Sequence, residues 1–165
     1  MIRLRYSVPE DLEFILASEG DAAHTPYIGS WTRAQHCRAI QQGDYNHFII
    51  QNGDDLVGYA ILKGMDSADK CIELYRIVVN EKGRGFGRAA IALIQQLCFG
   101  ERGAHRLFLD VVEDNARAIH LYTAMGFKHE GTLRECMKYP EGYKSLHLMG
   151  MLETEYHPEN TSQPH

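Results

Sequence analysis

The sequence has no long apolar run and no excess of positive charge. No stretch of its 165 residues approaches the apolar length of a membrane span. The first seven residues alternate like a strand and lack the apolar core of a secretory signal. The formal net charge is -5 at pH 7, which argues against nucleic acid as the main partner. We therefore expect a cytoplasmic protein that binds neither membranes nor nucleic acid.

The sequence also lacks the spacings that mark disulfide frameworks and metal sites. Its four cysteines are far apart and form no CxxC, and its nine histidines form neither HxxxH nor a cluster with cysteine. We expect reduced thiols and no bound metal. No internal repeat or linker interrupts the chain, so we predict a single domain over 1–155 and a polar C-terminal tail over 156–165.

Hydrophobic periodicity predicts seven strands and four helices. The order mixes hairpins with crossover connections, which predicts an α+β fold with a central, mixed but mostly antiparallel sheet flanked by the helices. The turn Asn52-Gly-Asp-Asp55 marks one hairpin, and Thr32 is the expected N-cap of the second helix. The expected strands are 2–7, 47–51, 56–63, 71–79, 106–112, 127–135 and 145–152, and the expected helices are 9–17, 33–42, 86–99 and 115–125.

A glycine-rich loop lies between the fourth strand and the third helix. In Lys82-Gly-Arg-Gly-Phe-Gly-Arg88, three glycines let backbone N–H groups approach phosphate oxygens at a helix N-terminus. A P-loop would need Lys followed by Ser or Thr, which is absent, and a dinucleotide fold would begin on the first strand. A glycine-rich turn without a ligand stays open as an alternative for this loop taken alone.

The fourth helix carries Asn115 and Tyr122, seven residues apart and therefore on one face. Taken alone, Asn115 reads as an N-cap and Tyr122 as a buried aromatic residue beside Ile119 and Met125.

Two motifs together give a resemblance to a known family. Arg84-Gly-Phe-Gly-Arg88 resembles the acetyl-CoA pyrophosphate loop of the GNAT N-acetyltransferase superfamily. Asn115 to Phe127 is similar to the family's pattern N-x-x-A-x-x-x-Y-x-x-x-G-F. The resemblance covers essentially the whole chain and extends to the RimJ/RimL-like and polyamine acetyltransferase branches. It implies the GNAT fold and transfer of an acetyl group from acetyl-CoA to a primary amine, on a small molecule or a protein N-terminus. We expect a monomer or homodimer.

The resemblance also implies site residues. Tyr122 is the expected general acid, since a phenol still carries its proton at neutral pH. Glu73 is the candidate general base, and a structural ion pair with Arg76 or a lysine is the alternative. Lys82 stands where the family commonly has Gln or Arg, so the register of the loop's start is an open point. The expected cofactor-binding residues are Ile77, Val78, Val79, Lys82, Gly83, Arg84, Gly85, Phe86, Gly87, Arg88, Asn115, Ala118 and Tyr122.

The acceptor amine is expected between the first two helices and the last hairpin. Aromatic walls and carboxylates suit a cationic amine there. By alternation, the sequence predicts that Glu73, Tyr75, Ile77 and Val79 share one face of their strand. A non-catalytic acyl-CoA-binding module and a nucleotide-binding protein remain as alternative functions. The candidate acceptor residues are Tyr27, Trp31, Tyr75, Glu135 and Tyr139, with His24 and Tyr143 beside them.

Overall fold

Seven strands form one sheet in a computed structural model that describes residues 1–43 and 45–158. The strand order is β1-β2-β3-β4-β5-β7-β6, and of these neighbouring pairs β4 with β5 is the parallel one. The mixed, mostly antiparallel sheet is as predicted. The strands are β1 Ile2–Tyr6, β2 Tyr45–Asn52, β3 Asp55–Lys63, β4 Cys71–Val79, β5 Arg106–Val112, β6 Lys128–Tyr139 and β7 Gly142–Leu152.

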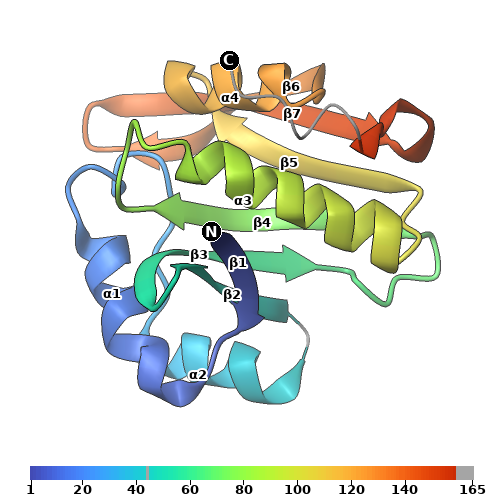
Figure 1. Ribbon diagram of the computed structural model, residues 1–165. Helices are drawn as coiled ribbons and strands as arrows, with labels where there is room; N and C mark the ends of the chain where they lie inside the picture. The colour runs from blue at the N-terminus through green and yellow to red at the C-terminus, as the bar shows by residue number, and fades with distance from the viewer. Residues whose placement is uncertain (44, 159–165) are drawn as a thin grey trace.

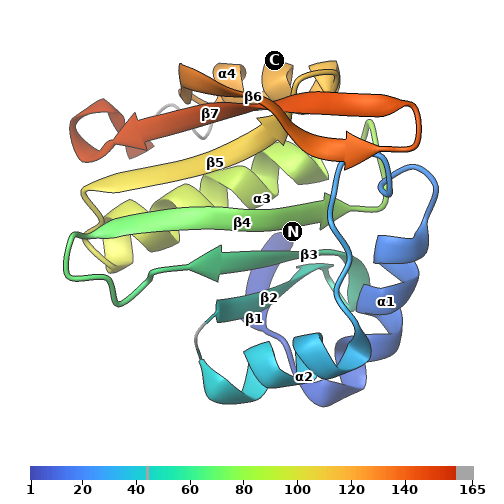
Figure 2. The same ribbon diagram turned by 180° about the vertical axis from the view of Figure 1, so that it is seen from behind.

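Four α-helices flank the sheet on both faces: α1 Leu12–Gly20, α2 Arg33–Gln42, α3 Phe86–Gln95 and α4 Ala116–Ala124. Helices α3 and α4 cover the face turned to the viewer in Figure 1. Helices α1 and α2 lie on the opposite face at the β1–β3 end, so the strands β4, β5 and β7 have no helix in front of them in Figure 2. The predicted Thr32 cap of α2 is confirmed, and Gln35 completes a capping box with it.

Several element boundaries differ from the predicted ones. The first helix begins with a 3-10 turn, Pro9–Asp11, because the Asp11 carboxylate accepts the Val8 N–H and pairs with Arg5. The third helix ends in a π-helical turn over Gln96–Glu101. Strands β6 and β7 are longer than predicted because pairing resumes after a bulge between Leu133 and Met137, and the chain then turns through Tyr139–Gly142. Residues 159–165 of the predicted tail lie outside the described residues.

A β-bulge in β4 overturns the predicted alternation. Ile61 pairs with Arg76 but Leu62 pairs with Leu74, so Tyr75 is an extra residue on the β4 side. After the bulge, Ile77 and Val79 pack against the α3 side of the sheet. Glu73 and Tyr75 therefore do not share a face with Ile77 and Val79. A strict alternation of sides along the sequence fails here, because the extra residue at the bulge reverses which residues of the second half of β4 face each side of the sheet.

The core divides in two on either side of the sheet. On the α3 and α4 side, Leu107, Leu109 and Ile91 belong to a large apolar cluster. On the α1 side, Ile15, Ile49 and Tyr59 belong to a smaller apolar cluster. No helix in the described part of the chain is long and apolar enough to cross a membrane.

Candidate active site

Strands β4 and β5 separate part-way along their length. Their parallel pairing covers Cys71, Ile72 and Glu73, with Glu73 opposite Phe108, and then ends. Beyond this point β4 continues to Val79 beside β3, and β5 continues to Val112 beside β7. Backbone groups on the inner edges of the two strands are thus left for another partner, because buried backbone donors and acceptors are normally paired. The two strands therefore splay apart beyond Glu73 and Phe108.

The glycine loop lies next to the splay and leads into α3. Gly83 and Gly85 have φ values of 82° and 77°, and Gly85 is the residue that precedes the first turn of the helix. A Cβ at either position would meet no atom within 4 Å, so the space beside the loop is open. Glycine is required by the positive φ, and the helix N-terminus directs N–H groups toward an anion.

A cleft of about 610 Å3 connects the splay, the glycine loop and α4. Twelve of the thirteen expected cofactor-binding residues line it. The exception is Arg84, whose guanidinium pairs with Glu81 and lies 4.8 Å from the Phe86 ring centroid. The cleft is also lined by residues that sequence reasoning did not single out, namely Ala23, Ile28, Glu81, Ile91, Asp114, Ala116, Arg117, His120, Leu121 and Ala124.

Three cationic side chains, Lys82, Arg88 and Arg117, line this cleft. Lys82 Nζ donates to the Ala23 carbonyl at 3.3 Å, which ties the glycine loop to the segment between α1 and α2. Lys82, the residue that departs from the family pattern, thus lies at the cleft. Positive side chains around an open glycine loop fit a diphosphate, and the splay fits an extended amide-containing arm. The residues present therefore fit a coenzyme A group.

Helix α4 presents Asn115 and Tyr122 to the same cleft. Asn115 Oδ1 accepts the Ala118 N–H at 3.3 Å, so its predicted capping role is confirmed. Tyr122 is 8% exposed and belongs to the apolar cluster, with its ring centroid 5.9 Å from that of Phe127. Burial, with the charge of Asp110, raises the pKa of Tyr122, so the phenol keeps its proton at neutral pH.

On the other face of the sheet, the aromatic rings of Trp31, Tyr45 and Tyr75 lie together. The centroid of the Trp31 ring is 5.1 Å from that of Tyr45 and 5.5 Å from that of Tyr75. The Arg76 guanidinium carbon is 5.1 Å from the Trp31 ring and 5.6 Å from the Tyr75 ring. An internal cation thus already contacts Trp31 and Tyr75, two of the aromatic side chains that were expected to receive an acceptor amine.

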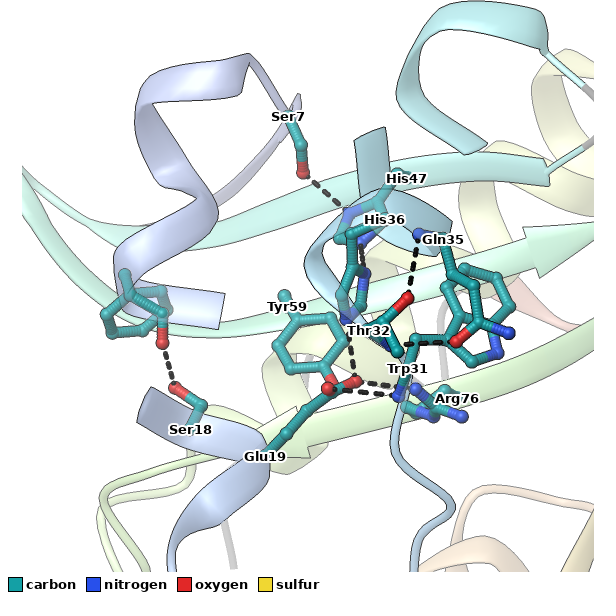
Figure 3. Close-up of polar contacts among 11 residues, drawn as sticks. Ser7, Ser18, Glu19, Trp31, Thr32, Gln35, His36, His47, Tyr59 and Arg76 are labelled. Atoms are coloured by element: carbon teal, nitrogen blue, oxygen red, sulfur yellow. Dashed lines mark hydrogen bonds and ion pairs between the residues drawn. The ribbon is translucent and has the colours of Figure 1, made fainter. Parts of the chain in front are cut away.

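The carboxylate of Glu19, on α1, forms hydrogen bonds with the residues around Arg76 (Figure 3). Its Oε1 accepts from the Arg76 guanidinium at 2.5 Å and from the Tyr59 hydroxyl at 2.8 Å. Its Oε2 accepts the backbone N–H of Trp31 at 3.3 Å. Burial opposes the charge of Glu19, but hydrogen bonds from His36 and Tyr59 and the charge of Arg76 outweigh it, and the net effect lowers its pKa. One carboxylate therefore joins α1, β3, β4 and the segment before α2.

A chain of polar contacts continues from Glu19 into the interior. His36 Nε2 lies 2.9 Å from Glu19 Oε1, His36 Nδ1 lies 3.2 Å from His47 Nε2, and His47 Nδ1 lies 2.8 Å from the Ser7 hydroxyl. These contacts are drawn in Figure 3. Burial, followed by the charge of His36, lowers the pKa of His47 to about 4. His47 is therefore neutral at physiological pH.

The remaining acceptor candidates are spread around the edge of this face. Tyr27 lines the cleft, as does His24. The Tyr139 hydroxyl donates to the Pro26 carbonyl at 2.9 Å and so joins the β6–β7 hairpin to the α1–α2 segment. Glu135, at a φ of 49°, lies at the β6 bulge, and Tyr143 is 59% exposed. Of the acceptor candidates, Tyr27 and His24 line the cleft, whereas the structure does not bring Trp31, Tyr75, Glu135, Tyr139 or Tyr143 to it.

Glu73, the candidate base, does not line the cleft. It faces the half of the sheet that no helix covers (Figure 2), and the Asp110 carboxylate lies near it. Burial, together with the charge of Asp110, raises the pKa of Glu73. Neither Glu73 nor Asp110 forms an ion pair within the described residues, so the alternative of a Glu73–Arg76 pair is wrong: Arg76 pairs with Glu19. Asp110 was missed in the sequence, although its alternation with Phe108 along β5 was the signal that placed both on one face.

Comparison with known proteins accounts for this combination of splay, glycine loop and α4. A family model described as the acetyltransferase (GNAT) family matches residues 13–127. The chain belongs to the GNAT family. The predicted superfamily and fold class are thereby confirmed, and the cofactor of a GNAT acetyltransferase is acetyl-CoA.

Among relatives of this GNAT chain is a spermidine N(1)-acetyltransferase of Vibrio cholerae, 28% identical over 71% of this chain and 69% of that protein. Another is the Escherichia coli K12 spermidine N(1)-acetyltransferase, 22% identical over 96% and 90%. A crystal structure of the Vibrio cholerae spermidine N-acetyltransferase with CoA and spermine has a TM-score of 0.82 at 23% identity, covering 93% of this chain and 96% of that one. This likeness extends the shared fold over nearly the whole chain.

Proposed function

We propose that this GNAT enzyme transfers the acetyl group of acetyl-CoA to a primary amine of a small cationic molecule, with a protein N-terminus as the alternative acceptor. The observation that carries this proposal is the single cleft in which the glycine loop, the β4–β5 splay and Tyr122 meet. Several similar proteins are spermidine N-acetyltransferases, which favours a small polyamine-like acceptor.

The cofactor site is assigned to the residues that line the cleft. Gly83, Gly85 and Gly87 hold the diphosphate with backbone N–H groups, and Lys82 and Arg88 add positive charge. Ile77, Val78 and Val79 on β4, with Asn115 and Ala118 on α4, flank the extended arm. When bound, acetyl-CoA supplies the thioester whose acetyl group is transferred.

Tyr122 and Glu73 are proposed to handle the protons. The amine must be neutral to attack, so Glu73 accepts its proton through water, and its raised pKa brings that carboxyl nearer to the working range of a base. A backbone N–H of β4 near Val79 stabilises the charge that develops on the carbonyl oxygen. Tyr122 then donates its hydroxyl proton to the departing sulfur.

A thiol-release assay with acetyl-CoA and a panel of amines tests this function. We expect release of CoA with polyamines and small diamines, and mass spectrometry should find one added acetyl group on the acceptor. CoA binding without release of thiol on any amine or peptide N-terminus would contradict the proposal. The cytoplasm as location, and a monomer or homodimer as assembly, remain part of the proposal, and sedimentation of the purified chain tests the latter.

A further inference from the structure

Two carboxylates face the half of the sheet that no helix covers. Residues paired across neighbouring strands point to the same side, and Glu73 pairs with Phe108. Asp110 is two residues beyond Phe108 on β5, so its side chain shares that side. Leu107, Leu109 and Val111 alternate with them and belong to the apolar cluster on the opposite side.

Asp110 lies at the mouth of the splay, where β5 has separated from β4. Its negative charge acts on two other groups of the site, since it contributes to the raised pKa values of both Glu73 and Tyr122. Burial raises the pKa of Asp110 itself. Asp110 thus lies within electrostatic reach of the proposed base and of the proposed acid.

The nearby cations are engaged elsewhere. Arg106, on the same side of β5, binds Glu130 at 2.5 Å and lies over the Phe108 ring at 5.0 Å. Lys63 is opposite Glu73 in the β3–β4 register, and its ammonium lies 5.6 Å from the Tyr45 ring centroid. No ion pair in the described part of the chain includes Glu73 or Asp110, although Lys63 partly offsets the charge of Glu73.

We propose that Asp110 and Glu73 together form the recognition site for a doubly charged acceptor, a diamine or longer polyamine. Glu73 lies opposite Phe108 on the neighbouring strand, so Asp110 is offset from Glu73 by two residues along the sheet, about 7 Å, which is of the same order as the separation of the nitrogens in 1,4-diaminobutane. Two carboxylates left without an ion-pair partner on the acceptor side attract a dication more strongly than a monocation. This inference rests on the proposed function and adds Asp110 as the specificity-determining residue.

The test measures binding without chemistry. Protein saturated with CoA, which has no acetyl group to transfer, is titrated in a calorimeter with 1,4-diaminobutane and with 1-aminopentane, which has similar length and one charge. Proton transfer to Glu73 does not enter such a measurement. We expect the wild type to prefer the diamine, and we expect that preference to shrink as salt concentration rises.

Asp110→Asn keeps the shape of the side chain and removes its charge. It should weaken diamine binding about tenfold and weaken aminopentane binding much less, and Glu73→Gln should act in the same direction. Asp110→Glu should keep the preference. Asp54→Asn is the matched control, since Asp54 is fully exposed in the β2–β3 turn and does not lie on β4 or β5.

Equal weakening of both amines by Asp110→Asn, or no change, would overturn the carboxylate site while leaving the acetyltransferase function in place. If the wild type binds no CoA, the proposed cofactor site is wrong. The same titration without CoA then tests whether the carboxylate pair alone prefers the diamine to the monoamine. If the diamine preference depends on Asp110 but no amine is acetylated, the proposed function fails and the recognition site stands.

Discussion

The two sides of this sheet are built by different means. On the cofactor side, the glycine loop and α4 are continuous stretches of sequence, each of which carries its own backbone conformation. On the acceptor side, Glu19 contacts Arg76 and Tyr59, which are 57 and 40 residues away. Local segments can keep their shape when distant parts change, whereas an arrangement held by one buried carboxylate depends on all its partners at once.

Loss of Glu19 should have the largest effect and should affect the acceptor side. Glu19→Ala leaves Arg76 buried without its carboxylate, and breaking a buried pair costs about 3–5 kcal/mol of unfolding free energy. Chemical denaturation measures this. Glu13→Ala on the same helix is the control, because Glu13 is 81% exposed and pairs with Arg33 at the surface, where such pairs contribute about 0–1 kcal/mol. A similar small loss for both variants would show that the acceptor side does not depend on Glu19.

Acid should weaken the same side through His47. Its pKa is about 4 in the folded protein and about 6.5 when unfolded. Between these values the unfolded chain binds a proton that the folded chain does not, so stability falls as pH is lowered from about 6.5 to about 4, by up to about 3 kcal/mol. Urea unfolding across this range should give a flatter pH profile for His47→Asn than for the wild type. His157→Gln, at an exposed histidine, should leave the slope as it was.

On the cofactor side, Gly85→Trp should fill the open space beside the loop. We expect CoA affinity to fall about 100-fold, about 2.7 kcal/mol, as measured by calorimetry. Gly103→Trp is the control, since Gly103 also has a positive φ, of 61°, and open space, but does not line the cleft. Both variants share the backbone strain, so only the first should lose CoA. Equal affinities in the two would argue against the phosphate role of the loop.

Tyr122→Phe should separate binding from chemistry within the cofactor side. Removing one hydroxyl should lower kcat about 10–100-fold if Tyr122 is the general acid, with CoA affinity changed little because the ring still fills its place. Tyr156→Phe is the control, since Tyr156 packs on Phe99 outside this cleft. Undiminished turnover in Tyr122→Phe would remove this residue from the acid role.

The same contrast explains what the sequence could predict. The mixed sheet, the Thr32 and Asn115 caps and the glycine loop follow from local patterns, and the family resemblance indicated twelve of the residues that line the cleft. The Tyr75 bulge does not, because nothing near it in the sequence shows that Ile61 and Leu62 pair with Arg76 and Leu74. Nor could Glu19 be singled out, since its partners are distant, and the sequence therefore left Glu73 as an alternative partner for Arg76.

The splay has a further consequence for how the sheet holds together. Elsewhere each inner strand is hydrogen-bonded on both sides, but β4 and β5 are no longer paired with each other beyond Glu73 and Phe108. A bound pantetheine arm has amide groups of its own and would form, in this gap, the hydrogen bonds that a short strand would form. Cofactor binding should then join the β1–β4 half of the sheet to the β5–β7 half, and hydrogen exchange at Val79 and Val112, whose amides face the splay in the strand register, should slow together when CoA is added.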